Sequence, residues 1–293
     1  QAEDGIRDRS PSRGLGDVYK RQLQGVPPLL FVAMRFALVV FPAVFFVRRP
    51  AGRWFDIALV GLLMSVGQFG FLYSSLAVGM PPGLASLVLQ IQAAFTAVFG
   101  ILILREHPTA AQKFGVALGL LGLGIIALGR GGDVSALGLG LCVAAASCWA
   151  AGNIAARRLK GVNGLSLTVW SGLVVPLPLL ALSLVVDGPA TVGYAVTHLT
   201  LANWASTAYT AGLASLFGYG VWNSLLSRHP AASVAPFSLL VPLVGITTAF
   251  LARGERPTVW SVVGGFLLLA GVAVTVFGPK LTRFGRTVDP LAH

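Results

Sequence analysis

Long apolar runs follow one another along the chain, separated by short connections that carry Gly, Pro or Arg. Each is long enough, at roughly 20 residues, to cross the hydrocarbon core of a bilayer as a helix. The nine runs cover residues 28–47, 54–78, 83–104, 110–129, 135–156, 166–186, 200–227, 231–252 and 258–278. The period-2 alternation of membrane β-barrels does not occur, and helices satisfy their own backbone hydrogen bonds in lipid. The pattern predicts an all-α polytopic membrane protein with nine transmembrane helices.

Composition agrees with lipid as the solvent. Hydrophobic residues make up 55% of the chain and charged residues only 11%, against about 25% charged in soluble domains. The net charge of +11 does not indicate nucleic acid, because the basic residues lie at span ends instead of on one soluble face. Cys142 and Cys148 lie six residues apart in one span, on different sides of a helix. We expect neither a disulfide nor a metal site there, and no cofactor.

Basic residues are distributed unevenly when the nine spans alternate across the membrane. One side receives Arg48, Arg49, Arg53, Arg105, Lys113, Arg157, Arg158, Lys160, Arg228, Lys280, Arg283 and Arg286. The other side receives only Arg130, Arg253 and Arg256. Since Lys and Arg collect in cytoplasmic loops, we expect the C-terminus in the cytoplasm of a multi-pass inner-membrane protein. Nine crossings then place residue 23 outside. An even number of helices with both ends inside is more usual, which indicates that one helix is missing before the first span.

Two stretches 149 positions apart match each other without gaps. Between the segments that begin at Tyr73 and Trp222, the matched pairs are Ser75 with Ser224, Glu106 with Glu255, Pro108-Thr109 with Pro257-Thr258, Gly115 with Gly264, and Gly122 with Gly271. The Glu-x-Pro-Thr turn is expected inside in the first copy and outside in the second. Inverted repeats of this kind are typical of secondary transporters, whose substrate site lies near the midplane between the halves.

The repeat divides the chain into four segments. The second half, 131–278, holds five of the predicted helices, whereas the first, 23–130, holds four and lacks the helix equivalent to 135–156. Residues 279–293 form a cytoplasmic tail. Residues 1–22 hold nine charges and form a polar segment of a different kind.

Residues 25–278 resemble the EamA-type drug/metabolite transporters, which have ten helices in two inverted five-helix halves. The resemblance rests on "PPLLFVAMRFALVVFPAVFFVRRP", "GMPPGLASLVLQIQAAFT", "SCWAAGNIAARR", "SLTVWSGLVVPLPLLALSLVVDG" and "VAPFSLLVPLVG". All five look close to bacterial exporters of O-acetylserine and cysteine, and the last four together are fairly specific within the family. The Trp-Gly-x-Asn-Phe-like pattern of the family's first helix does not occur in this sequence. Residues 1–22 resemble translated sequencing adapter, which predicts a non-native segment; a natural basic tail is the alternative.

Polar side chains inside spans are candidates for the transport pathway, because they are expensive in lipid and tend to face a cavity. Arg35 lies about seven residues, roughly 10 Å, into span 28–47. Its guanidinium could bind an amino-acid carboxylate with two hydrogen bonds, or it could instead snorkel outward or pair with a helix end.

Amide and aromatic side chains form a second group of candidates. Gln68, Gln90 and Gln92 offer donors and acceptors, and Gln90 and Gln92 differ by about 200° around a helix, so we expect only one of them to reach the lumen. Trp149 and Asn153 share one helix face, which suits a small zwitterion. Packing and interhelical hydrogen bonding are the alternatives.

The second half supplies further candidates. The resemblance implies that span 200–227 borders the pathway, where Tyr219, Trp222 and Asn223 would line it. Pro236 and Pro242 interrupt span 231–252, where freed carbonyls could bind substrate or permit bending during gating; a kink needed only for packing is the alternative. In contrast, the small-residue ridge of Gly115, Gly119 and Gly122 predicts a helix–helix contact.

The acidic and histidine residues after position 22 all fall at span ends or in loops. We therefore predict uniport or exchange without carboxylate-based proton coupling. No His-Glu-x-x-His, Gly-x-Ser-x-Gly or paired carboxylates occur within spans, so we predict no enzyme. The resemblance implies alternating-access export of small polar solutes such as cysteine and O-acetylserine. Drug or aromatic-compound export is the nearest alternative, and a non-transporting sensor or scaffold is a remote one. The oligomeric state stays open, a monomer included.

Overall fold

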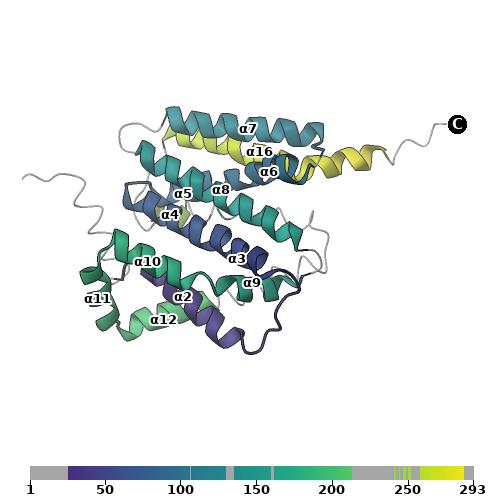
Figure 1. Cartoon of the computed structure of the whole chain (residues 1–293). Helices are drawn as coiled ribbons and strands as arrows, with labels where there is room; N and C mark the ends of the chain where they lie inside the picture. The colour runs from purple at the N-terminus through teal and green to yellow at the C-terminus, as the bar shows by residue number, and fades with distance from the viewer. Residues whose placement is uncertain are drawn as a thin grey trace, which may run out of the picture.

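The computed structural model describes residues 26–105, 107–129, 135–159, 162–212 and 258–286, with single positions between 241 and 251. Within this part every regular element is a helix (Figure 1). The helices are α2 (Pro28–Ala43), α3 (Trp54–Gly61), η1 (Leu62–Gly67), α4 (Gln68–Ala77), α5 (Pro82–Val88), η2 (Leu89–Ile91), α6 (Gln92–Leu104), α7 (Ala110–Leu128), α8 (Ala136–Arg158), α9 (Gly164–Gly172), α10 (Pro176–Val186), α11 (Pro189–Thr197), α12 (Leu201–Tyr209) and α16 (Val259–Arg286).

Five continuous helical segments are long and apolar enough to cross a membrane. They are Trp54–Ala77, Pro82–Leu104, Ala110–Leu128, Ala136–Arg158 and Val259–Gly278. Each agrees with a predicted span to within about two residues at either end. The first contains the π-helical turn η1 and the second contains the 3₁₀ turn η2. The predicted spans 200–227 and 231–252 lie in large part outside the described residues.

Two predicted spans need correction, and one short helix was not predicted. The span expected at 166–186 is broken, because α9 ends at Gly172 and α10 starts at Pro176 with a bend of 45°. Proline lacks the amide donor and disfavours a helical residue before it, which favours a break or kink at Pro176. The first helix ends at Ala43, shortly after Pro42, instead of at 47. A short helix, α11, was not predicted; it follows Gly188, whose φ of 85° reverses the chain after α10.

Helices α7 and α16 lie side by side and run antiparallel (Figure 1). A Cβ built on Gly122 would lie 2.5 Å from the carbonyl oxygen of Gly264, and one on Gly264 would lie 2.6 Å from that of Gly122. Gly115 and Gly271 approach each other in the same reciprocal way, at 2.6 Å in both directions. The predicted role of the glycine ridge as a helix–helix contact is confirmed.

These two contacts also follow the internal repeat. In the repeat, Gly115 corresponds to Gly264 and Gly122 corresponds to Gly271. The contact between Gly122 and Gly264 is therefore equivalent to the contact between Gly271 and Gly115 when the two repeats are exchanged. A two-fold axis perpendicular to both helices, and thus in the membrane plane, produces such an exchange. This is the relation expected of an inverted repeat.

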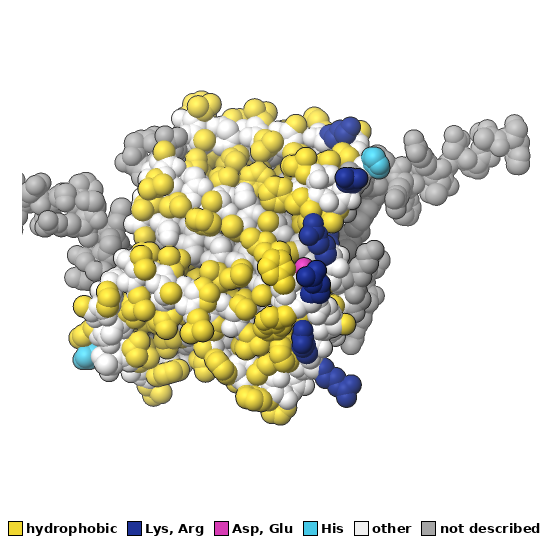
Figure 2. Space-filling model, viewed as in Figure 1, with side chains coloured by type: hydrophobic (Ala, Val, Ile, Leu, Met, Phe, Trp, Pro, Cys, Tyr) yellow, Lys and Arg dark blue, Asp and Glu magenta, His cyan; other side chains and the backbone are white. Residues whose placement is uncertain are grey.

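Apolar side chains cover the outside of the bundle as well as filling its inside. The largest buried cluster joins α5, α6, α8 and α16 through residues such as Val88, Ile91 and Leu268. In contrast, Phe45, Phe46 and Leu128 are more than 80% exposed. Figure 2 shows hydrophobic side chains spread over the face in view. Because such a surface is favourable in lipid and unfavourable in water, the fold is that of a membrane bundle.

Basic side chains gather at one end of the bundle, which we call the basic end (Figure 2). The helix ends and the loop before α3 that meet there supply Arg48, Arg49, Arg53, Arg105, Lys113, Arg157 and Arg158. The same end holds the C-terminal part of α16, because Gly278 packs against Ala111 at the start of α7. The described basic residues that charge counting assigned to one side therefore do lie together.

Candidate binding cavity

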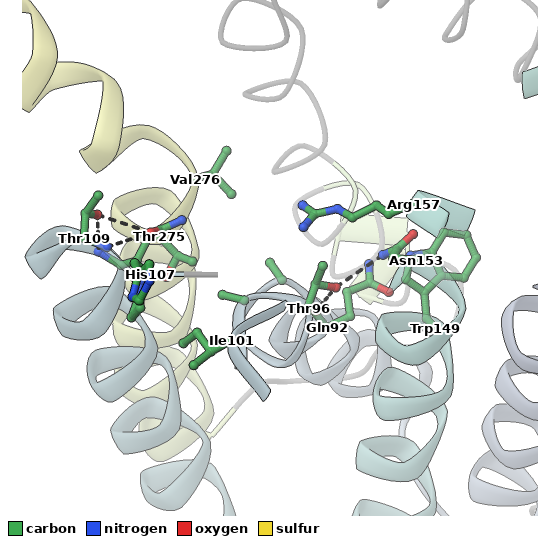
Figure 3. Close-up of a pocket in the computed structure, with 14 residues that line it drawn as sticks. Gln92, Thr96, Ile101, His107, Thr109, Trp149, Asn153, Arg157, Thr275 and Val276 are labelled. Carbon is green, nitrogen blue, oxygen red and sulfur yellow. Dashed lines mark hydrogen bonds between the residues drawn. The ribbon is translucent and has the colours of Figure 1, made fainter. Parts of the chain in front are cut away.

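A cavity of about 740 Å³ opens between α6, α8 and the α7–α16 pair (Figure 3). Its lining residues are Gln92, Ala93, Thr96, Ala97, Ile101, His107, Pro108, Thr109, Gln112, Trp149, Asn153, Arg157, Thr275 and Val276. Gln92 lies twelve residues before the end of α6, roughly 18 Å by helical rise and close to half the thickness of a bilayer. His107 and Arg157 lie at the basic end. The cavity thus extends from mid-membrane depth to the basic end of the bundle.

One wall of the cavity is a face of α8. Trp149, Asn153 and Arg157 follow one another at intervals of four residues, which places them one above the other on the helix. Figure 3 shows all three side chains on the cavity side of α8. The wall therefore changes from aromatic at mid-membrane depth, through an amide, to a guanidinium at the basic end.

A short hydrogen-bond chain joins this wall to α6. Asn153 Nδ2 donates to Thr96 Oγ1 at 3.3 Å, and the Thr96 hydroxyl donates to the backbone oxygen of Gln92 at 2.7 Å. Thr96 and Gln92 are four residues apart and so share a face of α6. Because its amide nitrogen faces Thr96, the Asn153 side chain is oriented with Oδ1 available as an acceptor.

Two glutamine oxygens are buried without a donor in the described part of the chain, Gln68 Oε1 and Gln92 Oε1. A buried acceptor left without a hydrogen bond costs about 1–3 kcal/mol. Gln92 lines the cavity, whereas Gln68, at the start of α4, does not. Gln90 is only 8% exposed and is absent from the lining. As their angular separation predicts, only one residue of the pair Gln90 and Gln92 reaches this cavity.

Arg35 lies apart from the cavity lining. Its guanidinium carbon lies 5.5 Å from the ring centroid of Phe36 and 5.6 Å from that of Phe69, between α2 and α4. The cation is thus placed over two aromatic faces, a favourable arrangement. The other predicted site residues, Tyr219, Trp222, Asn223, Pro236 and Pro242, lie outside the described residues.

Several polar residues of the lining were not predicted from the sequence. They are Thr96, His107, Thr109, Gln112, Arg157 and Thr275. Arg157 had been counted only as a basic residue at a span end. The signal that was available is the interval of four residues: Arg157 follows Asn153, and Thr96 follows Gln92, by one helical turn.

The chemistry of the lining is suited to binding a small solute. The described lining residues supply amides, hydroxyls, an indole, an imidazole and a guanidinium, but no carboxylate or thiol. Among the described residues, no group of three or more His, Cys, Asp or Glu side chains is placed to hold a metal ion. Such a cavity can recognise a small polar solute through hydrogen bonds and a fixed positive charge.

Comparison with known proteins agrees with this description. The profile of the EamA-like transporter family matches residues 15–128 and 136–277. A probable amino-acid metabolite efflux pump of Salmonella typhimurium is 39% identical over 275 residues, which cover 92% of each chain. A protein of the same description from Escherichia coli is 39% identical over 267 residues, 89% of each chain.

More distant relatives extend the comparison. A probable terminal-alkyne amino-acid exporter of Streptantibioticus cattleyicolor is 32% identical over 232 residues, 77% of this chain and 74% of the other. A solved crystal structure matches with a TM-score of 0.57 and 19% identity, covering 97% of this chain and 100% of the other. At that identity the structural match shows the fold alone.

Proposed function

Because this chain belongs to the EamA-like transporter family, we propose that it exports small amino-acid metabolites, of the cysteine and O-acetylserine kind, by alternating access. Family membership makes it a multi-pass membrane transporter and not an enzyme. Its relatives are described as amino-acid metabolite efflux pumps and an amino-acid exporter, which supports the same broad substrate class. The particular solutes and the mechanism are our proposal.

The observation that carries the proposal is the cavity between α6, α8 and the α7–α16 pair. Its volume of about 740 Å³ lies within the usual range of about 300–1,000 Å³ for small-molecule sites. Trp149 offers an apolar surface, while Gln92 and Asn153 offer hydrogen-bonding amides. An amino-acid metabolite has both an apolar side chain and a charged head group, so the indole can contact its side chain while the amides bind its head group.

In the proposed export cycle, the position of the basic end identifies the side on which substrate is loaded. Cytoplasmic loops of membrane proteins carry an excess of Lys and Arg, so the basic end and the C-terminus are placed on the cytoplasmic side of the inner membrane. The cavity then opens to the cytoplasm and represents the loading state. Release requires closure at the basic end and opening at the other, by rocking of the repeats predicted at 23–130 and 131–278. The described lining residues include no carboxylate, which supports a cycle of uniport or exchange.

Export by intact cells tests the proposal. Cells that overproduce the chain should release more cysteine and O-acetylserine than cells with empty vector. Asn153→Leu should lower that release several-fold because it removes the amide from the cavity wall. Gly140→Ala is the matched control on α8, since its added Cβ meets no atom within 4 Å. Both variants should be compared at equal membrane abundance.

The rival functions give different results. An exporter of aromatic compounds would leave the two amino-acid metabolites unchanged and lower the cellular content of aromatic solutes, a reading that Trp149 in the cavity wall makes worth testing. A sensor or scaffold would change neither. If Asn153→Leu and Gly140→Ala cells released equal amounts, the cavity wall would not take part in transport, and the proposal would be wrong.

A further inference from the structure

We infer that Arg157 and Gln92 recognise the two charged ends of an α-amino acid, with the Arg157 guanidinium binding the carboxylate and Gln92 Oε1 accepting a hydrogen bond from the ammonium group. This inference rests on the proposed function and specifies how its cavity selects substrates. It assigns the carboxylate to a residue that sequence analysis treated only as part of the basic end.

Arg157 is placed to meet a carboxylate inside the cavity. It lies on the same face of α8 as Asn153, one helical turn nearer the basic end. Figure 3 shows its side chain extending from α8 over the space between that helix and the α7–α16 pair. A guanidinium presents several N–H donors in one plane and can bind both oxygens of a carboxylate together. Arg35, the earlier candidate, is held over Phe36 and Phe69 outside the lining.

Gln92 is placed to meet the ammonium group. Gln92 lines the cavity, and its Oε1 atom is buried and has no donor in the described part of the chain; the side chain must turn toward the cavity for this oxygen to accept from a ligand. A bound N–H group would remove the cost of that missing hydrogen bond. Asn153 supports the same site, because its Nδ2 is engaged by Thr96 and its Oδ1 is left as a second acceptor. Amide oxygens therefore lie deeper in the cavity and the guanidinium lies nearer the basic end.

The spacing of the two groups suits one small molecule. Asn153 and Arg157 are four residues apart, about 6 Å along α8. An α-amino acid carries its ammonium and carboxylate groups on the same carbon, so one molecule can reach both. Its side chain would then extend toward Trp149 and the apolar part of the wall.

The arrangement also predicts selection by charge. The described lining contains Arg157 and His107 but no acidic residue. A solute with only a positive charge would be repelled by Arg157 and would find no carboxylate among these residues. A zwitterion can bind Arg157 through its carboxylate and Gln92 through its ammonium group, whereas an anion without an ammonium group can bind only Arg157. We therefore expect affinity to decrease from a zwitterion to its N-acylated anion and then to its esterified cation.

Three analogues of one amino acid test this order without any mutation. S-methyl-L-cysteine is the zwitterion, its N-acetyl derivative is the anion, and its methyl ester is the cation; none of them can oxidise to a disulfide. Binding to the purified full chain in detergent is measured by calorimetry. We expect the methyl ester to bind at least roughly tenfold more weakly than the zwitterion, the effect of losing one charge-assisted hydrogen bond. Equal affinity for zwitterion and methyl ester would overturn the inference.

Variants then assign the two ends to residues. Arg157→Gln should weaken binding of the zwitterion roughly tenfold or more but should change the already weak methyl ester little. Arg158→Gln is the matched control, because it removes the same charge one residue away at a position outside the lining. Gln92→Leu should weaken the zwitterion more than the N-acetyl derivative. Gln92→Glu should instead improve the methyl ester, because it adds a negative charge beside the ammonium group.

The outcomes separate the inference from the function on which it rests. If the wild-type chain binds the zwitterion and Arg157→Gln equals Arg158→Gln, the inference is wrong and the proposed function stands. If the wild-type chain binds none of the three analogues and cells release no amino-acid metabolite, the proposed function fails and the inference fails with it. Gain of methyl ester binding by Gln92→Glu supports the inference even if Arg157→Gln is unstable.

Discussion

The contact between α7 and α16 predicts a large difference between two alanine substitutions only two residues apart. In Gly122→Ala the new Cβ would lie 2.5 Å from the Gly264 carbonyl oxygen and 2.5 Å from the backbone nitrogen of Leu268. Ordinary van der Waals contacts of a Cβ begin at about 3.4 Å, and backbone atoms cannot rotate away as side chains do. The two helices must therefore separate by roughly 1 Å along this contact.

The size of the effect follows from two opposing terms. Overpacking of this kind costs about 1–3 kcal/mol, while replacing glycine by alanine inside a helix gains up to about 1 kcal/mol. With the full propensity gain, we expect Gly122→Ala to lose up to about 2 kcal/mol of stability. Gly124→Ala has nothing within 4 Å of its Cβ, so it keeps the propensity gain without a clash. Because the propensity gain is common to both variants, they should differ by the overpacking cost, roughly 1–3 kcal/mol.

Thermal unfolding in detergent, followed by loss of the monodisperse species on a sizing column, measures the difference. At about 2–4 °C per kcal/mol for chains of this size, Gly122→Ala should unfold several degrees below Gly124→Ala. A double variant with Gly264→Ala should lose less than the sum of the single losses, because the first Cβ has already separated the helices at the shared contact. If Gly122→Ala and Gly124→Ala unfold at the same temperature, the close approach of α7 and α16 is wrong.

Three further predictions concern the cavity, the topology and a helix end. Thr96→Val keeps the side-chain volume but removes the hydroxyl that accepts from Asn153. The substrate concentration for half-maximal export should therefore rise several-fold at unchanged protein level, and an unaltered value would show that Thr96 does not orient Asn153. Lys113→Cys should react with a membrane-impermeant maleimide only from the cytoplasmic side and Thr191→Cys only from the opposite side, and labelling of both from one side would contradict the proposed orientation. Asn163→Ala should lower stability by about 1 kcal/mol, because the Asn163 side chain accepts from two backbone amides at the start of α9; thermal unfolding checks this, and no loss would mean that the cap is dispensable.

The sequence could not reveal which polar side chains meet. Asn153 and Thr96 are 57 residues apart, and their hydrogen bond depends on how α6 and α8 are rotated against each other. Arg35 and Arg157 illustrate the same limit. Arg35 looked functional because it lies inside a predicted span, and Arg157 looked like an ordinary basic residue near a span end. Only helix packing places the first over aromatic rings and the second in the cavity lining.

The amino-acid sequence by itself determined the membrane environment, the positions of five spans, the common end of the described basic residues and the glycine contact. Each of these depends on local quantities: the free energy of placing one segment in lipid, the charge near its ends, or residues repeated along one helix face. Tertiary structure decided the pairing of α7 with α16, the shape of the cavity and the side chains that line it. These depend on the rotation and pairing of helices distant in sequence, which hydropathy does not encode. The break between α9 and α10 depends on both: the sequence contains Pro176, which favours a break, but only the folded chain shows the bend of 45°.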